Sequence, residues 1–310
     1  MSGSIAALVP VFAVIVLGYG LSRGRFVDDG FWSAAERITF YVFFPALLVA
    51  STAKANLAGL DAGAVALALL GAIALVLATA RALRRPLRLN GPAYSSLIQA
   101  AIRPNVYVAF SAATALFGRD GLAAISLCIA IVVPAVNVVS VYALVRHGAH
   151  AGASVAAAQE WRRIGAGVAA NPLVLACAAG FALNLTGVGL PPLIGPLLEI
   201  LGQASLAVGL LAVGAGLDLK ALRDAGPGVA AAALLKLAVL PLAAWLLALT
   251  LGLGGVALAA VMTTSAVPVS ATAYVMARQM GGDAKIMAGA ITATTLAALI
   301  TMPLLLSLVM

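Results

Sequence analysis

Two stretches of the sequence combine a proline with polar side chains inside an otherwise apolar run. Their polar residues are Arg103, Asn105 and Tyr107 around Pro104, and Ser270 and Thr272 just after Pro268. A guanidinium matches a carboxylate through two parallel hydrogen bonds, and hydroxyl and amide groups can complete such a site. These residue types therefore predict that a small carboxylate binds where the two stretches meet.

The two prolines also predict broken helices. Proline removes a backbone donor and clashes with the preceding turn, and in a membrane the freed backbone groups need partners. A broken helix leaves partly charged ends pointing inward, and matching breaks in two halves of a chain indicate a substrate site near the membrane midplane. The alternative is a plain kink closed by neighbouring hydroxyls. We favour the site, because the breaks fall in matching spans and one of them carries an arginine.

The composition places the chain in a membrane. Of its 310 residues, 64% are hydrophobic and 9% are charged, whereas an ordinary soluble domain has roughly a quarter charged residues. The net charge of +8 does not indicate nucleic-acid binding, because the charges fall in short loops between apolar runs. No Lys or Arg precedes the first run, from Ile5 to Leu21, so we interpret it as a retained span. We expect a multi-pass protein of the bacterial inner (plasma) membrane.

Crossing a membrane takes roughly 20 apolar residues in a helix. We predict ten spans, at about 4–22, 35–53, 60–80, 93–117, 121–145, 164–186, 196–217, 226–250, 255–279 and 284–309. With both termini outside, all but four of the 18 basic residues lie on the cytoplasmic side, as the positive-inside rule requires. Lys54 and Arg119 lie outside, and Arg103 and Lys236 lie within spans.

The polar linker 146–163 divides the chain into halves at 1–145 and 164–310. Five spans in each half would make the second half inverted relative to the first. Three pairs of prolines recur at similar offsets, namely Pro10 and Pro172, Pro104 and Pro268, and Pro134 and Pro303. We therefore predict an all-α integral membrane fold of two inverted five-helix repeats with broken, crossing helices 4 and 9.

The two basic residues within spans have no Asp or Glu at a comparable depth. Each costs about 2.5–3.5 kcal/mol to insert, and a vacant anion site explains why Arg103 is there. The alternative is that Arg103 bonds carbonyls exposed at the break. For Lys236 three interpretations stay open: an ammonium in the place of a sodium ion, a proton carrier, because burial disfavours the charged form, or a lysine with no coupling role. Coupling to protons or to sodium is therefore open.

Other polar residues have weaker roles. Asn137, Gln99 and Tyr274 could contact a substrate or join helices to one another. His147 and His150 have helical spacing but no further ligands nearby, so we expect no metal site. No nucleotide-binding glycine motif and no HExxH, GxSxG or CxxC occurs, so we expect neither an enzyme nor a cofactor. The Arg81–Arg88 run is interpreted as a topogenic loop that could touch anionic membrane lipid.

Four segments carry a family resemblance: VPVFAVIVLGYGLSRGRF, ITFYVFFPALLVAS, the RPN break and SAVPVSATAYVMARQMGGD. With them the chain resembles the auxin efflux carrier family of membrane transport proteins, in its short bacterial form, over essentially its full length. The resemblance implies a scaffold of spans 1, 2, 6 and 7, a mobile transport domain of spans 3–5 and 8–10, elevator-type alternating access and a homodimer. Pro104, Asn105 and Pro268 match the family's crossover, whereas the role of Arg103 is inferred from its chemistry.

The resemblance also implies organic-anion substrates such as malate or malonate in bacteria and auxin in plants. The chain has nothing like the long cytoplasmic loop of the plant carriers, so auxin is not the expected substrate. We expect a secondary active transporter of small organic anions, either carboxylates such as malate or malonate or auxin-like acids. The alternatives are a sodium-coupled symporter of bulkier anions, similar to the bile-acid carriers of related fold, a ligand-gated channel or sensor, and an exporter of neutral amino acids.

Overall fold

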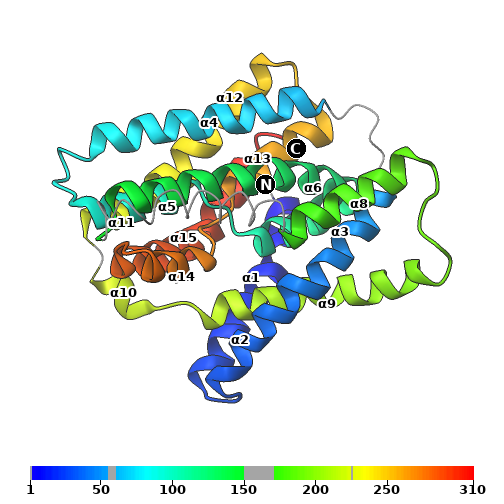
Figure 1. The fold of residues 1–310 in the computed structure, drawn as a ribbon, viewed down its shortest axis with the longest axis horizontal. Coiled ribbons are helices and arrows are strands. Elements are labelled where there is room, and N and C mark those ends of the chain that lie inside the picture. The colour runs from blue at the N-terminus through cyan, green and yellow to red at the C-terminus, as the bar shows by residue number, and fades with distance from the viewer. Residues whose placement is uncertain (1, 55–60, 150–170, 225) are drawn as a thin grey trace.

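The computed structural model describes all residues of the chain except 1, 55–60, 150–170 and 225 (Figure 1). The described residues form helices. They are α1 (Ser2–Arg23), α2 (Asp29–Ile38), η1 (Thr39–Phe43), α3 (Phe44–Ala53), α4 (Ala62–Leu83), α5 (Gly91–Ile102), α6 (Val106–His147), α8 (Pro172–Leu185), α9 (Ile194–Ala215), α10 (Leu219–Arg223), α11 (Pro227–Leu234), η2 (Leu235–Val239), α12 (Leu240–Thr250), α13 (Gly255–Ala266), α14 (Thr272–Gln279) and α15 (Ala284–Leu306). The segments η1 and η2 are single π-helical turns inside longer helices.

Seven helical segments of the described chain are long and apolar enough to cross a membrane. Five of them are the single helices α1, α4, α6, α9 and α15. The other two are continuous runs, one from α2 to α3 through η1 and one from α11 to α12 through η2. This confirms an all-α, multi-pass membrane protein. The predicted spans 4 and 9 are interrupted, and the part of span 6 before Asn171, with most of the linker and His150, lies outside the described residues.

Helix α6 covers 42 residues and joins the second half of predicted span 4 to span 5. The two parts meet at Gly118, whose φ of 59° and ψ of −140° are not helical. A residue with a side chain rarely adopts this backbone conformation, so the glycine permits the reversal between the two predicted spans.

Side-chain caps explain where many helices begin. Asp61, Asn90, Asn105, Asn171 and Asp283 each accept a hydrogen bond from a backbone N–H in the first turn of the helix that follows. Such a cap satisfies donors that a helix start otherwise leaves unpaired, and it is worth about 0.5–2 kcal/mol. The sequence thus sets these helix starts through short polar side chains at the ends of apolar runs.

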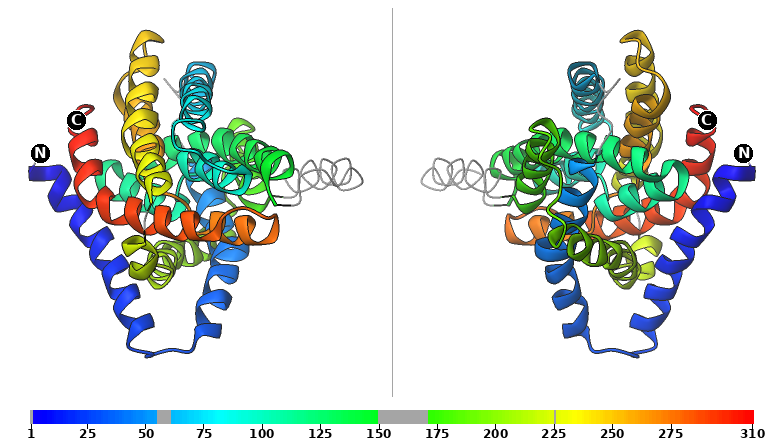
Figure 2. Two further views of the ribbon diagram at one scale, coloured as in Figure 1. Left: turned by 90° about the vertical axis from the view of Figure 1, so that its left-hand side faces the viewer. Right: turned by 90° about the vertical axis from the view of Figure 1, so that its right-hand side faces the viewer.

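The helices pack into two apolar clusters. One cluster holds α4, α5, the second part of α6 and the helices from η2 to α15, with α4 lying along α12 (Figure 1). The other holds α1, α3, α8, α9 and the first part of α6, and residues from the second part of α6, η2, α13 and α15 also join it. Helices α1 and α3 both pack against α9. Figure 2 shows α1 and α2 as the two arms of an open V.

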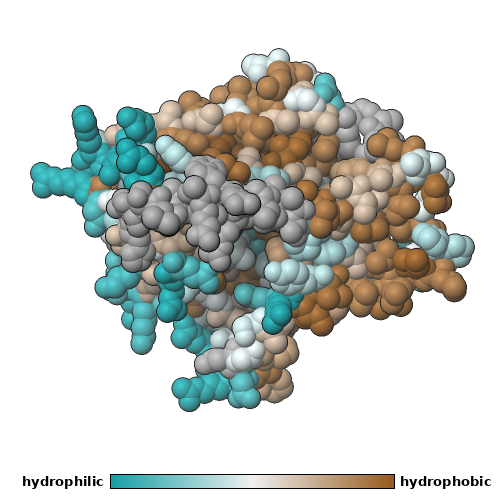
Figure 3. All heavy atoms as spheres, viewed as in Figure 1, coloured by the Kyte–Doolittle hydropathy of each residue, from teal (hydrophilic) through white to brown (hydrophobic). Residues whose placement is uncertain are grey.

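Close approach between α1 and α9 depends on glycine. A Cβ at Gly18 would overlap the backbone of Leu211, and a Cβ at Gly214 would overlap the backbone of Ile15. Small residues let membrane helices approach closely and gain van der Waals contact, which is the main attraction available between apolar helices in lipid. Polar side chains gather at the end of the molecule where α4 leads into α5, and apolar ones cover much of the remaining visible face (Figure 3).

Candidate functional site

The two proline breaks lie against each other. Between α5 and α6, and between α13 and α14, the chain is extended, and an isolated antiparallel bridge joins Pro104 to Val269. The Asn105 N–H donates to the Pro268 carbonyl at 2.9 Å, and the Ser270 N–H donates to the Arg103 carbonyl at 3.3 Å. The two predicted breaks are far apart in the sequence, and each supplies backbone partners that the other lacks, as burial away from water requires.

Asn105 holds the start of α6. Its Oδ1 accepts from the N–H groups of Tyr107, at 3.1 Å, and Val108, at 3.3 Å. The side chain is 1% exposed, and its Nδ2 has no partner among the described residues. The carboxamide oxygen of Asn105 thus already occupies the partly positive end of this half-helix.

Arg103 is a buried cation with weak partners. The residue is 8% exposed and follows the last residue of α5. Its Nη2 lies 3.4 Å from Thr272 Oγ1, its Nη1 lies 3.4 Å from Met276 Sδ, and its Nε has no partner within the described chain. The one ion pair among the described residues joins Lys54 to Glu199, so no carboxylate pairs with Arg103. The guanidinium therefore has donors available for an added acceptor.

A pocket of about 150 Å³ opens beside this guanidinium. Its lining residues are Phe40, Arg103, Pro104, Val106, Tyr107, Val133, Val136, Asn137, Asn171, Leu173, Ser270 and Thr272. The predicted residues Arg103, Tyr107, Asn137, Ser270 and Thr272 are thus brought together, with the Ser270 and Thr272 hydroxyl oxygens 2.9 Å apart. Asn105 and Pro268 stand outside this lining and act on the backbone of the crossing.

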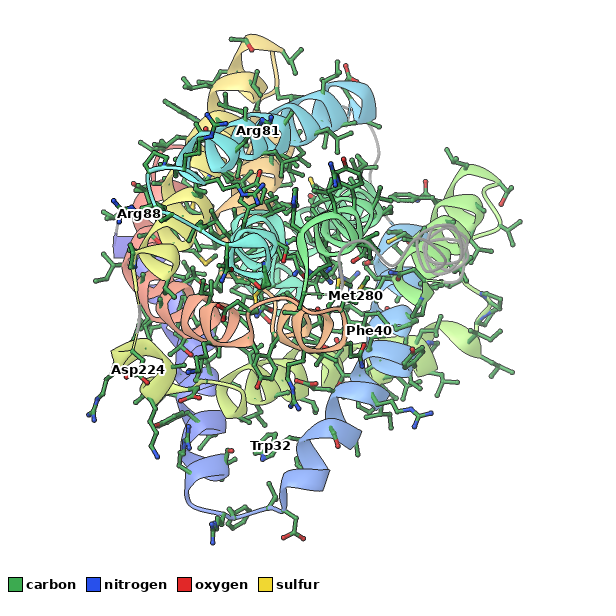
Figure 4. The ribbon with its side chains drawn as sticks, turned by 60° about the vertical axis from the view of Figure 1, so that its left-hand side comes forward. Trp32, Phe40, Arg81, Arg88, Asp224 and Met280 are labelled. Carbon is green, nitrogen blue, oxygen red and sulfur yellow. The ribbon has the colours of Figure 1, made fainter. Side chains whose placement is uncertain are left out.

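Sequence reasoning missed six residues of the pocket, namely Phe40, Asn171 and the four aliphatic residues Val106, Val133, Val136 and Leu173. Phe40 lies on the π turn η1 (Figure 4), and Asn171 caps α8 through a 2.9 Å bond from the Leu173 N–H. A signal for Asn171 was present, because an asparagine directly before a proline is a common helix start. Nothing in the aromatic run around Phe40 distinguishes that position from its neighbours.

Tyr107 closes one side of the pocket against the α1–α3–α9 cluster. Its ring centroid lies 5.0 Å from that of Phe44, and the residue is 6% exposed. On the α9 side the Tyr107 ring lies over Gly209. A Cβ at Gly209 would clash with the ring, at 2.5 Å from Tyr107 Cδ1 and 3.0 Å from Tyr107 Cγ. The missing side chain at Gly209 therefore sets the position of the Tyr107 ring.

Lys236 is a second buried cation, apart from the pocket. It lies on the π turn η2, is fully buried, and its Nζ donates to the Ser265 carbonyl at 2.9 Å. Ser265 is next to the last residue of α13, whose C-terminal end is partly negative. Among the described residues no carboxylate pairs with this ammonium. The lysine therefore neutralises the end of one interrupted helix.

The remaining candidates do not form a site together. Both side-chain polar atoms of buried Gln99 lack partners in the described part of the chain. Tyr274 lies under the Arg278 guanidinium, with 5.9 Å between the group and the ring centroid. The His147 ring packs on Tyr94, and the described residues contain no group of three potential metal ligands.

Seven membrane-length helical segments among the described residues define a multi-pass membrane protein, and a pocket with both apolar and polar walls lies at its two crossed helix breaks. The sequence model of the family described as Membrane transport protein matches residues 164–306, the range that holds α8 to α15. Over this range the chain is similar to the auxin efflux carrier family of membrane transport proteins, which confirms the resemblance. This family comprises transporters and not enzymes. No curated protein matched the chain.

Proposed function

We propose that the protein is a secondary active transporter of small organic anions, and that a substrate carboxylate binds Arg103 at the crossing of the broken helices. The observation that carries this proposal is a guanidinium, 8% exposed, that borders a pocket and has no carboxylate partner among the described residues. Leaving a buried charge unpaired is costly, and a carboxylate ligand would remove that cost.

The chemistry of the pocket suits one carboxylate on a small molecule. The guanidinium can hold the carboxylate through two hydrogen bonds, while Ser270, Thr272 and Asn137 offer neutral polar groups. Phe40 and Leu173 add apolar walls that exclude water. The volume of about 150 Å³ lies below the range of roughly 300–1,000 Å³ that is usual for drug-sized ligands. Malate and malonate fit this description better than bulkier anions.

The proposed mechanism divides the helices into a scaffold and a moving part. The helices of spans 1, 2, 6 and 7 are α1, α2 to α3, α8 and α9, and α1 and α3 pack on α9 while α3 also packs on α8. The helices of the other spans share the cluster that contains α4, α5 and α12, and α6, α13 and α15 also contact the cluster that contains α1 and α9. We infer two inverted five-helix repeats, elevator-type movement along the scaffold and a homodimer formed through it.

The proposed orientation places the arginine-rich end in the bacterial cytoplasm and both termini outside. Phe40, Asn137 and Asn171 lie in the halves of their helices nearer that end, so the pocket opens toward the cytoplasm. The described conformation then corresponds to an inward-facing transporter.

The contacts of Lys236 are relevant to whether transport is coupled to sodium or to protons. Its bond to the Ser265 carbonyl supports the first of the three interpretations, in which an ammonium does what a bound cation would do at this helix end. Transport should then not need sodium. Proton carriage by Lys236 remains the second interpretation, and it predicts flux that depends on a proton gradient.

A thermal-shift panel on detergent-purified protein tests the proposal. The ligands are malonate, malate, indole-3-acetate, taurocholate and neutral amino acids, each with and without sodium. A ligand at about 100 times its dissociation constant stabilises the folded state by about 2.7 kcal/mol, which is measurable. We expect small carboxylates to stabilise the wild type and not Arg103→Ala, while Arg146→Ala, an exposed arginine away from the pocket, responds as the wild type does. An equal response of Arg103→Ala would contradict the proposal.

A further inference from the structure

The last turn of α4 and the turn that follows it carry four arginines, at 81, 84, 85 and 88. Helix α4 ends in a tight cap in which the Leu89 N–H donates to the Arg84 carbonyl at 3.0 Å. Arg88 then has a φ of 50°, in the left-handed region. Glycine is the usual residue at this position of such a cap, because any side chain there strains the backbone.

Helix α1 ends in the same way. The Phe26 N–H donates to the Leu21 carbonyl at 3.1 Å, and Arg25 has a φ of 51°. Both arginines thus occupy positions where glycine would strain the backbone least. The presence of arginine there is therefore explained by its side chain and not by its backbone conformation. The two turns differ in their surroundings, which makes the α1 turn a matched control for the α4 turn.

The α4 turn borders a groove lined by three arginines. The groove has a volume of about 760 Å³ and is lined by Ala78, Arg81, Ala82, Arg84 and Arg85. The Arg84 guanidinium lies 4.6 Å from the centroid of the Tyr94 ring, which fixes its direction. None of these arginines pairs with a carboxylate in the described part of the chain. Arg81 and Arg88 project at this end of the molecule (Figure 4).

An apolar stripe on α4 runs into the groove. Leu67 is 64% exposed, Leu70 is 40% exposed and Leu75 is 52% exposed, and they share a face with Ala78 at helical spacing. The same face ends in exposed Arg81 and Arg85. An uncovered apolar stripe that ends in unpaired guanidinium groups has the shape and polarity of a phospholipid, with acyl chains along the stripe and a phosphate at the arginines.

We propose that the groove formed by Arg81, Arg84 and Arg85, together with Arg88 later in the same turn, binds the headgroup of an anionic phospholipid such as phosphatidylglycerol. The inference is independent of the substrate and of Arg103. It assigns the arginines a ligand in addition to any effect on membrane orientation. The occupant is the lipid and not a free phosphate compound, because the stripe on α4 offers a place for acyl chains.

Native mass spectrometry of delipidated protein tests this proposal. The protein is titrated with phosphatidylglycerol, with phosphatidylethanolamine of the same chains and with glycerol 3-phosphate. We expect tighter binding of phosphatidylglycerol than of either other compound. Each basic side chain near an anionic lipid adds to the binding free energy, so removing one arginine should weaken lipid binding roughly fivefold. The double variant Arg81→Ala with Arg85→Ala should therefore weaken lipid binding about thirtyfold.

The two strained arginines supply the control. Arg88→Gly relieves backbone strain and should raise the melting temperature, yet it should weaken binding of phosphatidylglycerol. Arg25→Gly relieves the same strain in the α1 turn and should leave lipid binding unchanged. Equal binding of the two lipids, equal binding of glycerol 3-phosphate, or an equal loss in Arg88→Gly and Arg25→Gly would overturn the proposal. A cooperative melting curve for each variant serves as the control that the variant is folded.

Discussion

At the scale of single residues, the protein places two cations at interrupted helices without pairing either with an acid. Arg103 borders the pocket, whereas Lys236 is enclosed and bonded to the Ser265 carbonyl. The different surroundings assign different tasks to the two cations: Arg103 can meet a ligand, and Lys236 holds a helix end together.

The role of Lys236 predicts a loss of stability. In Lys236→Met the side chain keeps most of its apolar volume, but the Ser265 carbonyl loses its donor, and leaving a buried acceptor unpaired costs about 1–3 kcal/mol. The melting temperature of the purified variant should fall accordingly. A variant as stable as the wild type would show that the ammonium contributes nothing to this helix end.

Gly209 predicts a second effect at the residue scale. In Gly209→Ala the new Cβ would collide with the Tyr107 ring, so the ring must move, and overpacking of this kind costs about 1–3 kcal/mol. We expect lower thermal stability and weaker carboxylate binding in a thermal-shift titration. Gly20→Ala is the matched control, because no atom lies within 4 Å of a Cβ there. Equal behaviour of the two variants would contradict the proposed contact.

The residue types at the crossing could be predicted from the sequence, but the full pocket could not. Arg103, Ser270 and Thr272 were identified because polar groups beside a proline are unusual in an apolar run. Phe40 was not, because apolar side chains surround it and only the π turn η1 decides which of them meets the pocket. Asn105 stays a predicted substrate contact, and the capping of α6 by its Oδ1 was not predicted.

At the scale of helices, the crossing depends on short half-helices whose ends are capped. Asn105→Ala should remove the α6 cap and cost about 0.5–2 kcal/mol of stability. Asn105→Asp keeps an oxygen acceptor for the cap but adds a negative charge near the anion site. We therefore expect Asn105→Asp to be close to the wild type in melting temperature and to bind carboxylates more weakly.

Asn90 provides the control for that pair. Its side chain caps α5 through the Ala93 N–H at 2.9 Å, far along α5 from the crossing. Asn90→Ala should lose a similar amount of stability and keep its carboxylate affinity. If Asn90→Ala and Asn105→Asp weakened binding equally, the local charge would not be the cause.

The helix breaks could be predicted from the sequence, whereas the two π turns could not. Proline marks the interruption at Pro104 because it cannot donate to the preceding turn. The π turns η1 and η2 are each followed two residues on by a proline, Pro45 and Pro241, but a proline alone does not distinguish a π turn from a plain kink. The matching breaks predicted that the two stretches meet, but the pairing of Pro104 with Val269 is a long-range contact that sequence patterns do not encode.

At the scale of the whole molecule, the asymmetry of charge predicts the orientation. Val188 is 70% exposed in the connection between α8 and α9, and Phe26 is 76% exposed at the end of α1. On intact cells, a membrane-impermeant maleimide should label Val188→Cys and not Phe26→Cys. The natural Cys128 and Cys177 are each 1% exposed and should give little background. The reverse labelling pattern would contradict the proposed orientation.

The central claim is that a small carboxylate crosses the membrane bound to Arg103, and counterflow in proteoliposomes tests it most directly. Vesicles loaded with unlabelled malonate or malate take up the labelled compound from outside, in sodium and in sodium-free buffer. We predict uptake by the wild type in both buffers, loss in Arg103→Ala, and partial recovery in Arg103→Lys, which keeps the charge without the planar fork. Uptake by Arg103→Ala at the wild-type rate would contradict the claim.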